Sequence, residues 1–161
     1  MDTSKIYMFK NQNSGLFMEV ANGTAEDGAN VQQWGADKVS AHNSWTLKSF
    51  GGGYYYIISQ LADGRTYYLN IAGGSGENGA NAEILKNNKT SSHLFKFVKN
   101  PDGTYYILTR ASKDAAAIEI ANADKSSGAN VAQWTVNGNT CQKWIADVSE
   151  PVTTTSAAIT T

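Results

Sequence analysis

The sequence predicts an all-β domain made of three similar units of about 50 residues each. Residues 28–34 (GANVQQW) return as residues 128–134 (GANVAQW), and residues 19–22 (EVAN) return as residues 119–122 (EIAN). A weaker copy lies between them and includes residues 79–85 (GANAEIL). No window shows a sustained apolar period of 3.6 residues, so we expect almost no helix.

Each unit is expected to form four short strands in the same order. The first strand is rich in aromatic and β-branched residues, which favour strands, at 6–9, 54–58 and 105–108. The second strand alternates apolar and polar residues, at 16–20, 67–71 and 118–120. A Gly/Asn-rich turn follows, and then the third strand begins in the repeated Gly-Ala-Asn segment. The fourth strand opens on an aromatic residue, at 45–47, 95–97 and 144–146.

Twelve such strands must close around a shared core, because one unit alone cannot bury its apolar face. The repeats span about residues 5–50, 54–99 and 104–148, within one domain of residues 1–149. Residues 150–161 open on Glu-Pro and are rich in Thr, the composition of a linker between modules. The alternative for this tail is an ordinary disordered terminus.

The composition disfavours several classes of protein. The net charge is -1 and only 17% of residues are charged, with no basic run that would bind nucleic acid. The single cysteine cannot form an internal disulfide, and no apolar stretch is long enough to insert into a membrane. No signal peptide is visible, so the chain is either intracellular or a module of a longer secreted protein. The Thr-rich tail favours the secreted module, as a fragment lacking its signal peptide.

The closing strands carry the motif by which the chain resembles a known family. The third unit has Gln142-Lys143-Trp144, the first Asn43-Ser44-Trp45 and the second His93-Leu94-Phe95. Three such motifs in register resemble the Gln-x-Trp repeat of ricin-type lectins, and are most similar to carbohydrate-binding modules of bacterial polysaccharide-degrading enzymes. The resemblance covers residues 5 to about 147. It implies a β-trefoil with pseudo-threefold symmetry.

The resemblance also implies one sugar site in each unit. A sugar needs an aromatic wall for its C–H face, and an acid and amides for its hydroxyls. Carried over, the family pattern assigns these sugar-binding residues in the first and third units: Glu19, Gln32, Trp34, His42, Asn43, Glu119, Trp134, Asn139 and Gln142. In the second unit the matching positions are Asn70, Glu83, Leu85, Ser92 and His93. We expect no working site there, because the acid of the second strand and the aromatic wall are both missing.

Alternatives remain open for several of these residues. Trp34 and Trp134 are expected to be sugar walls, although a repeated Trp can also be core. Glu19 and Glu119 face away from their apolar neighbours and are expected outside the core, as site acids or alternatively as plain exposed strand residues. Asn43 and Gln142 are alternatively braces for the backbone. Three further expectations concern structural roles: Trp45, Phe95 and Trp144 form core, Asn30, Asn81 and Asn130 stabilise turns, and His42 and His93 are surface hydrogen-bonding residues rather than metal ligands.

The predicted function is non-catalytic carbohydrate binding, with no cofactor and no metal. The chain has no hydrolase, metalloprotease or phosphate-binding motif, and its repeated acids lie in separate units rather than as one catalytic pair. We expect a module that targets a secreted, covalently linked glycoside hydrolase to a polysaccharide containing galactose, arabinose or xylose. The alternatives are a cell-surface lectin, the targeting domain of a toxin and, from a different class, a protein-binding trefoil such as a protease inhibitor.

Overall fold

The structure is a computed structural model that describes residues 1–36, 38–86 and 90–149. Within these residues it contains twelve strands, no α-helix and six short 3-10 turns, which confirms the predicted all-β trefoil. The first unit holds β1 (Ile6–Asn11), β2 (Phe17–Val20), β3 (Val31–Trp34) and β4 (Trp45–Gly51). The second holds β5 (Tyr54–Ser59), β6 (Tyr68–Ile71), β7 (Ala82–Leu85) and β8 (Phe95–Lys99). The third holds β9 (Tyr105–Thr109), β10 (Ala116–Ile120), β11 (Val131–Thr135) and β12 (Trp144–Ser149). The predicted linker, residues 150–161, lies outside the described residues.

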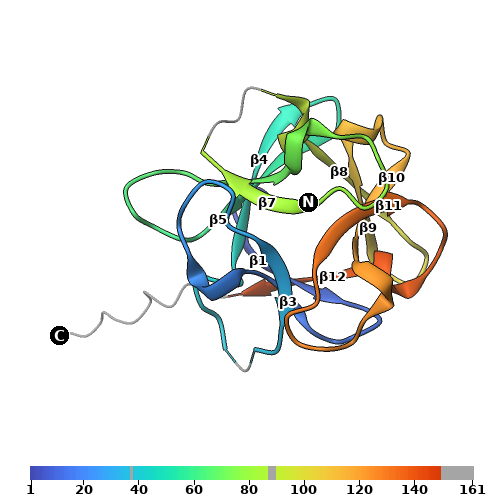
Figure 1. Cartoon of the computed structure of the whole chain (residues 1–161), viewed down its shortest axis with the longest axis horizontal. Helices are drawn as coiled ribbons and strands as arrows, with labels where there is room; N and C mark the ends of the chain where they lie inside the picture. Colours follow the sequence, from blue (N-terminus) through green and yellow to red (C-terminus); the bar gives the residue numbers. More distant parts are fainter. Residues whose placement is uncertain (37, 87–89, 150–161) are drawn as a thin grey trace.

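The first and fourth strands of the three units form a six-stranded barrel. Each pairs antiparallel with its neighbours, in the closed order β1, β4, β5, β8, β9, β12 and back to β1. Closure leaves no free edge in this ring. Figure 1 shows the three units as successive colour sectors around the middle of the molecule.

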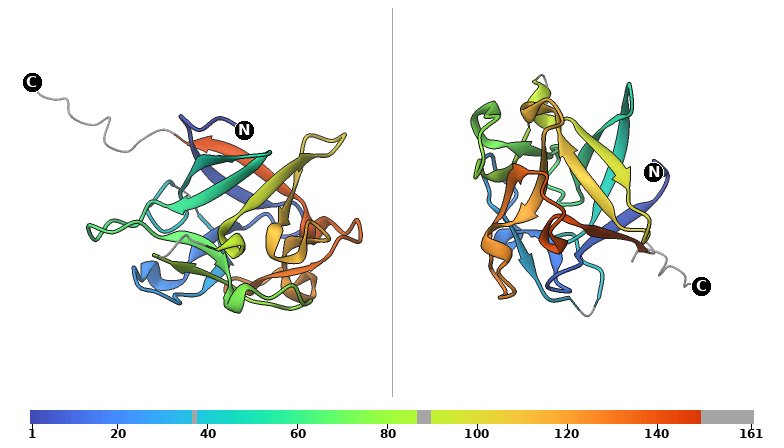
Figure 2. Two further views of the ribbon diagram at one scale, coloured as in Figure 1. Left: turned by 90° about the horizontal axis from the view of Figure 1, so that it is seen from above. Right: turned by 90° about the vertical axis from the view of Figure 1, so that its right-hand side faces the viewer.

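The second and third strands of each unit form a hairpin that caps the barrel. The pairs are β2 with β3, β6 with β7 and β10 with β11. The hairpins meet one another through the bridges Asn30–Glu83, Gln32–Asn130 and Asn81–Ala132. Figure 2 shows the turns of these hairpins at the end of the molecule away from the N-terminus. Equivalent positions of the three units are therefore related by a pseudo-threefold axis that passes between the hairpins.

The core lies inside the barrel and beneath the hairpins. Trp45, Phe95 and Trp144 open the fourth strands and are fully buried, as predicted. The indole N–H of Trp45 donates to the carbonyl of Met18 at 3.1 Å, and that of Trp144 to the carbonyl of Ile118 at 3.0 Å. A buried indole N–H needs such a partner. Each of these two tryptophans therefore ties the closing strand of its unit to the second strand.

Three asparagines form a closed ring of hydrogen bonds at the axis, which differs from the turn-stabilising role expected for them. The side-chain amide of Asn30 donates to Asn130 at 2.9 Å, that of Asn130 to Asn81 at 2.6 Å, and that of Asn81 to Asn30 at 2.8 Å. Each amide thus gives one bond and receives one. Each unit contributes one Asn side chain, and these three side chains join the units to one another.

We expect Asn81→Ala to lower the free energy of unfolding by about 1–2 kcal/mol. The substitution removes two of the three bonds and leaves the Asn30 oxygen without its donor and the Asn130 amide without its acceptor. Guanidinium unfolding followed by tryptophan fluorescence measures the change. Ser127→Ala is the control, because Ser127 is exposed and makes no hydrogen bond with the described residues. Equal stability of the two variants would contradict a stabilising ring.

Two buried glutamines connect neighbouring hairpins, and sequence analysis did not single them out. Gln33 is fully buried and donates to the carbonyls of Asp124 and Ser126 in the third unit, both at 2.9 Å. Gln133 is also fully buried and donates in the same way to two carbonyls of the second unit, those of Ser75 and Glu77 at 2.7 and 2.9 Å. Each glutamine lies directly before an exposed tryptophan, so it fixes the strand that carries the tryptophan.

Candidate functional site

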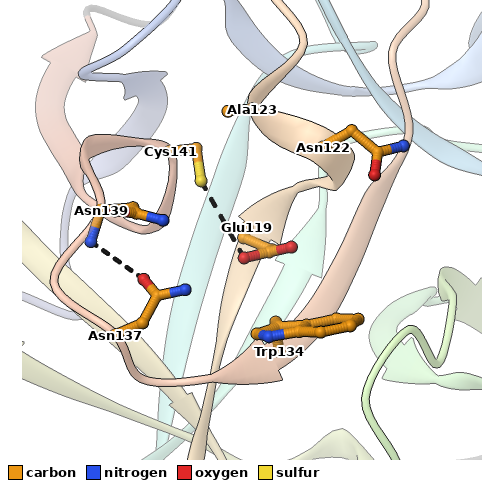
Figure 3. A pocket seen from close by; sticks show the side chains of 7 residues that line it. All are labelled: Glu119, Asn122, Ala123, Trp134, Asn137, Asn139 and Cys141. Carbon is orange, nitrogen blue, oxygen red and sulfur yellow. Dashed lines mark hydrogen bonds between the residues drawn. The ribbon is translucent and has the colours of Figure 1, made fainter.

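A pocket in the third unit gathers three of the predicted site residues. It has a cavity volume of about 330 Å³. Figure 3 shows the Glu119 carboxylate between the Trp134 ring and the Cys141 thiol. The lining residues come from β10, β11 and the turns that follow them: Glu119, Asn122, Ala123, Trp134, Asn137, Asn139 and Cys141. One carboxylate, three amide side chains and one aromatic face therefore surround a single open pocket.

Glu119 is more buried than its position on the strand indicated. Its side chain faces away from Ile118 and Ile120, as expected, yet the residue is only 7% exposed. The Gln142 amide donates to its Oε1 at 3.2 Å, and the Cys141 thiol lies 3.9 Å from the same oxygen. Burial raises the pKa of the Glu119 carboxyl, and the bond from Gln142 opposes this rise only in part.

We expect the Glu119 carboxyl to titrate with a midpoint above its ordinary value of 4.5. Desolvation disfavours the charged form, so the carboxyl gains its proton at a higher pH as the solution is acidified. The pocket then loses its carboxylate acceptor at a higher pH than a solvated glutamate would allow. ¹³C NMR of the side-chain carboxyls measures this midpoint, and Glu119→Gln identifies the resonance by its disappearance. A midpoint at or below 4.5 would contradict the effect of burial.

Trp34 and Trp134 lie outside the core, as the wall interpretation requires. They are 48% and 42% exposed, whereas Trp45 and Trp144 are fully buried. The edge of the Trp34 ring lies beside Gly128, in the hairpin turn of the third unit. Both indoles therefore present a large apolar surface to solvent, and that of Trp134 lies in the same pocket as the carboxylate of its own unit.

In the first unit the carboxylate–amide pair spans the hairpin. Glu19 and Gln32 face each other across β2 and β3, and the Gln32 amide donates to Glu19 Oε2 at 2.8 Å. His42 lies directly over Gly23, because a Cβ at Gly23 would come 2.3 Å from His42 Nε2. The third unit has Ala123 and the smaller Cys141 at the corresponding positions, so the extra methyl group is accommodated there.

Asn43 and Gln142 are buried and bonded to the backbone, which favours the bracing role that was the alternative for them. Asn43 is 5% exposed, and its side chain bonds to the backbone of Lys38 and Ser40. Gln142 is fully buried, accepts from the backbone N–H of Asn137 at 2.9 Å and donates to the Thr135 carbonyl at 3.0 Å. Both side chains therefore support the backbone behind the site.

The second unit contains the same pair with its members exchanged between strands. Asn70 on β6 faces Glu83 on β7, and the Asn70 amide donates to Glu83 Oε2 at 2.9 Å. The acid absent from the second strand is therefore present on the third. The aromatic residue of the third strand is not exchanged but lost, because Leu85 pairs with Tyr68 where Trp34 pairs with Phe17.

Two buried polar atoms in the second unit have no hydrogen-bond partner among the described residues. These are Asn70 Oδ1 and His93 Nε2, and both residues are 2% exposed. Burial lowers the pKa of the His93 imidazole. Sequence analysis expected His93 on the surface, and this is wrong, since Thr90 and the ring of Tyr68 pack around it.

Sequence reasoning missed Asn122, Asn137 and Cys141 as lining residues. Asn122 has a φ of +61° in the turn after β10, and the equivalent Asn22 has a φ of +57°, so the repeated Asn marks a turn that approaches the site. The Asn137 side chain accepts from the backbone N–H of Asn139 at 2.9 Å. No repeat of the sequence marked Asn137, because it lies in a loop that differs among the units.

Among residues 1–36, 38–86 and 90–149, no three His, Cys, Asp or Glu side chains come together in a way that would hold a metal ion. In that part of the chain, no helix has the length and apolar character needed to cross a membrane.

Comparison with protein families gives one match that extends over almost the whole chain. The model of the family described as "Ricin-type beta-trefoil lectin domain-like" matches residues 2–85 and 91–160. A search of curated protein sequences found no match.

Comparison with solved structures gives many similar folds. The designed threefold-symmetric protein ThreeFoil is 28% identical, with a TM-score of 0.81, over 88% of this chain and 96% of that one. An exo-β-1,3-galactanase from Clostridium thermocellum is 27% identical, with a TM-score of 0.82, over 90% of this chain but only 30% of that one. The C-terminal half of an earthworm R-type lectin, solved with GalNAc, is 18% identical with a TM-score of 0.72, over 90% and 99% of the two chains.

Proposed function

Because the chain belongs to the ricin-type beta-trefoil lectin domain-like family, we propose that it binds carbohydrate without catalysing a reaction. The observation that carries this proposal is the third-unit pocket, in which the exposed Trp134 lies beside the carboxylate of Glu119 and the amides of Asn137 and Asn139. An aromatic face packs against the C–H face of a sugar ring, while carboxylates and amides bind its hydroxyls.

The first and third units are the proposed ligand sites. Glu19, Gln32, Trp34 and His42 form the first, and Glu119, Trp134, Asn137 and Asn139 form the third. The second unit keeps a carboxylate in Glu83 but offers Leu85 where the others have tryptophan. We expect it to contribute least to binding, because a leucine provides no flat face for a sugar ring.

The ligand is proposed to be a polysaccharide containing galactose, arabinose or xylose, and the chain a secreted module linked to a glycoside hydrolase through the Thr-rich segment 150–161. Two relatives support this direction. The galactanase is an enzyme of which this fold covers only a part, and the earthworm lectin was solved with GalNAc. A lectin of a cell surface or a toxin would use the same site chemistry on a different glycan.

A glycan and plant-polysaccharide array tests the proposal directly. We expect selective binding, with a polysaccharide held more tightly than its monosaccharide, because one shallow site gives a Kd near about 1 mM and two sites on one rigid body act together. The double variant Trp34→Ala, Trp134→Ala should lose this binding while keeping its circular dichroism spectrum. If a folded wild-type protein bound no glycan, a protein-binding trefoil would replace this proposal.

A further inference from the structure

A second pocket lies outside the three repeated sites, where the second unit meets the third. Its cavity volume is about 410 Å³. The residues that line it are Tyr54, Ser91, Arg110, Ala111, Lys113 and Asp114. Ser91 comes from the turn before β8, and the last four come from the loop after β9. The pocket is polar, and positive side chains predominate in it.

The Tyr54 ring and the Asp114 carboxylate hold two cations at this pocket. Lys96 Nζ lies 4.6 Å and the Arg110 guanidinium 4.9 Å from the centre of the Tyr54 ring, within cation–π range. Asp114 Oδ2 accepts from the Tyr54 hydroxyl at 2.7 Å and lies 3.4 Å from Lys96 Nζ. With Lys113, three positive charges face one carboxylate, although the whole chain carries a net charge of -1.

Several polar groups of this pocket could bind a ligand without losing a partner. Among the residues that the structure describes, neither Arg110 nor Lys113 forms an ion pair. In the same residues Asp114 Oδ1 is a buried atom without a hydrogen-bond partner. A guanidinium binds a carboxylate or sulfate through two parallel hydrogen bonds, and a carboxylate oxygen accepts from a hydroxyl. The pocket therefore offers donors for an anion and an acceptor for a hydroxyl.

The other two unit junctions show that the fold does not require these charges. The backbone N–H of Arg110 bonds to Leu94, and those of Gln60 and Gln12 make the equivalent bonds to Ser44 and Lys143. Arg110 thus occupies the position of two neutral glutamines. By the same symmetry, Lys96 follows Phe95 where Thr46 follows Trp45 and Ile145 follows Trp144. The cations are special to one of three equivalent junctions.

The loop that carries Arg110, Lys113 and Asp114 has a fixed and uncommon backbone. Lys113 and Asp114 have φ values of +59° and +66°, which non-glycine residues seldom adopt. The Lys113 N–H bonds to the Arg110 carbonyl at 2.8 Å, and the Asp114 N–H to the Thr109 carbonyl at 3.0 Å. These bonds hold the loop in a conformation that places Arg110, Lys113 and Asp114 around one cavity.

We propose that this pocket binds an acidic sugar unit, with Arg110 and Lys113 on its carboxylate or sulfate ester and Asp114 on a neighbouring hydroxyl. The inference rests on the proposed function only in taking the ligand to be a carbohydrate. It adds a site for charge to sites for neutral sugars. A polysaccharide that carries both acidic and neutral units would then be held at two places on one rigid domain.

The test compares methyl β-D-glucuronide with the uncharged methyl β-D-glucoside by ¹H–¹⁵N NMR titration. We expect the glucuronide to bind more tightly and to shift the amides of Ser91, Lys113 and Asp114. Raising the ionic strength from about 0.01 M to about 0.1 M should weaken its binding, because the screening length falls from about 30 Å to about 10 Å. Equal affinity for the charged and uncharged sugars would overturn the proposal.

Arg110→Gln tests the role of Arg110 in binding the anion. Glutamine is chosen because the other two junctions carry glutamine, Gln12 and Gln60, at the equivalent position. We expect it to weaken glucuronide binding about tenfold, since a hydrogen bond to a charged group is lost. Lys48→Gln, at an exposed position on β4, should have no effect. The double variant Trp34→Ala, Trp134→Ala should keep glucuronide binding, so this site and the repeated sites can fail independently. If Arg110→Gln binds as the wild type does, the assignment of Arg110 is wrong.

A sulfated sugar and inorganic sulfate show which anionic group the pocket prefers and whether it requires a sugar. Methyl β-D-glucoside 6-sulfate, bound with the same dependence on Arg110 and more tightly than the glucuronide, would support the site and name the ester as its group. Tighter binding of the glucuronide would name the carboxylate. Inorganic sulfate bound as tightly as either sugar would overturn the part of the proposal that requires a carbohydrate.

Discussion

Trp45→Ala is expected to lower the free energy of unfolding by about 3–5 kcal/mol, the largest stability effect predicted for this protein. The Trp45 side chain is fully buried in the core, so its removal leaves a large cavity. It also leaves the carbonyl of Met18 without the indole N–H that bonds to it at 3.1 Å. Because small domains are stable by only about 5–15 kcal/mol, this is a substantial part of the total. Guanidinium unfolding measures the loss.

Trp34→Ala is the matched control, since it removes the same side chain from the surface of the same unit. Trp34 is 48% exposed, so we expect its removal to change the unfolding free energy by less than about 1 kcal/mol. An equal loss of stability in both variants would contradict the division of the tryptophans into core and exposed wall.

Trp134→Ala is expected to weaken sugar binding in the third unit by at least about tenfold. The ring lines the pocket beside Glu119, and a sugar that covers such a side chain gains about 1.5–3 kcal/mol from its burial. NMR titration of the selected sugar, followed through the amides of residues 137–141, measures the third site by itself. The substitution changes only the pocket of the third unit, so the first site should keep its affinity.

Val136→Ala controls for the loss of exposed apolar surface near the end of β11. Val136 is 37% exposed and does not line the pocket, so binding should not change. Unchanged affinity in Trp134→Ala would remove the tryptophan from the site. A fall in affinity at both units would instead mean that the variant disturbs the whole domain.

Local pattern was enough to predict the strands and the burial of the repeated aromatics. The alternation at residues 118–120 and the aromatic at the start of each fourth strand follow from what a strand buries on one face. The exposure of Trp34 and Trp134 was also foreseeable, because Leu85 at the equivalent position shows that the core does not need an aromatic there. These features depend on the neighbours of a residue in sequence.

Contacts between units could not be predicted in the same way. Asn30, Asn81 and Asn130 repeat like turn residues, and their ring exists only because the axis brings three distant loops together. The exchange of Asn70 and Glu83 has a different cause, because it depends on the pairing of two strands within the second unit. Sequence comparison of the units shows an acid lost from β6, whereas the register shows that the acid faces the same position from β7.

The sequence by itself determined the all-β class, the three units and the aromatic residues that face inward or outward. Each of these follows from periodicity and local side-chain chemistry, which are written along the chain. Only the tertiary structure decided that Glu119 is buried against Gln142 and that Arg110 and Lys96 share the ring of Tyr54. Burial and charge depend on atoms supplied by residues far apart in the chain, and the packing of the three units sets their distances.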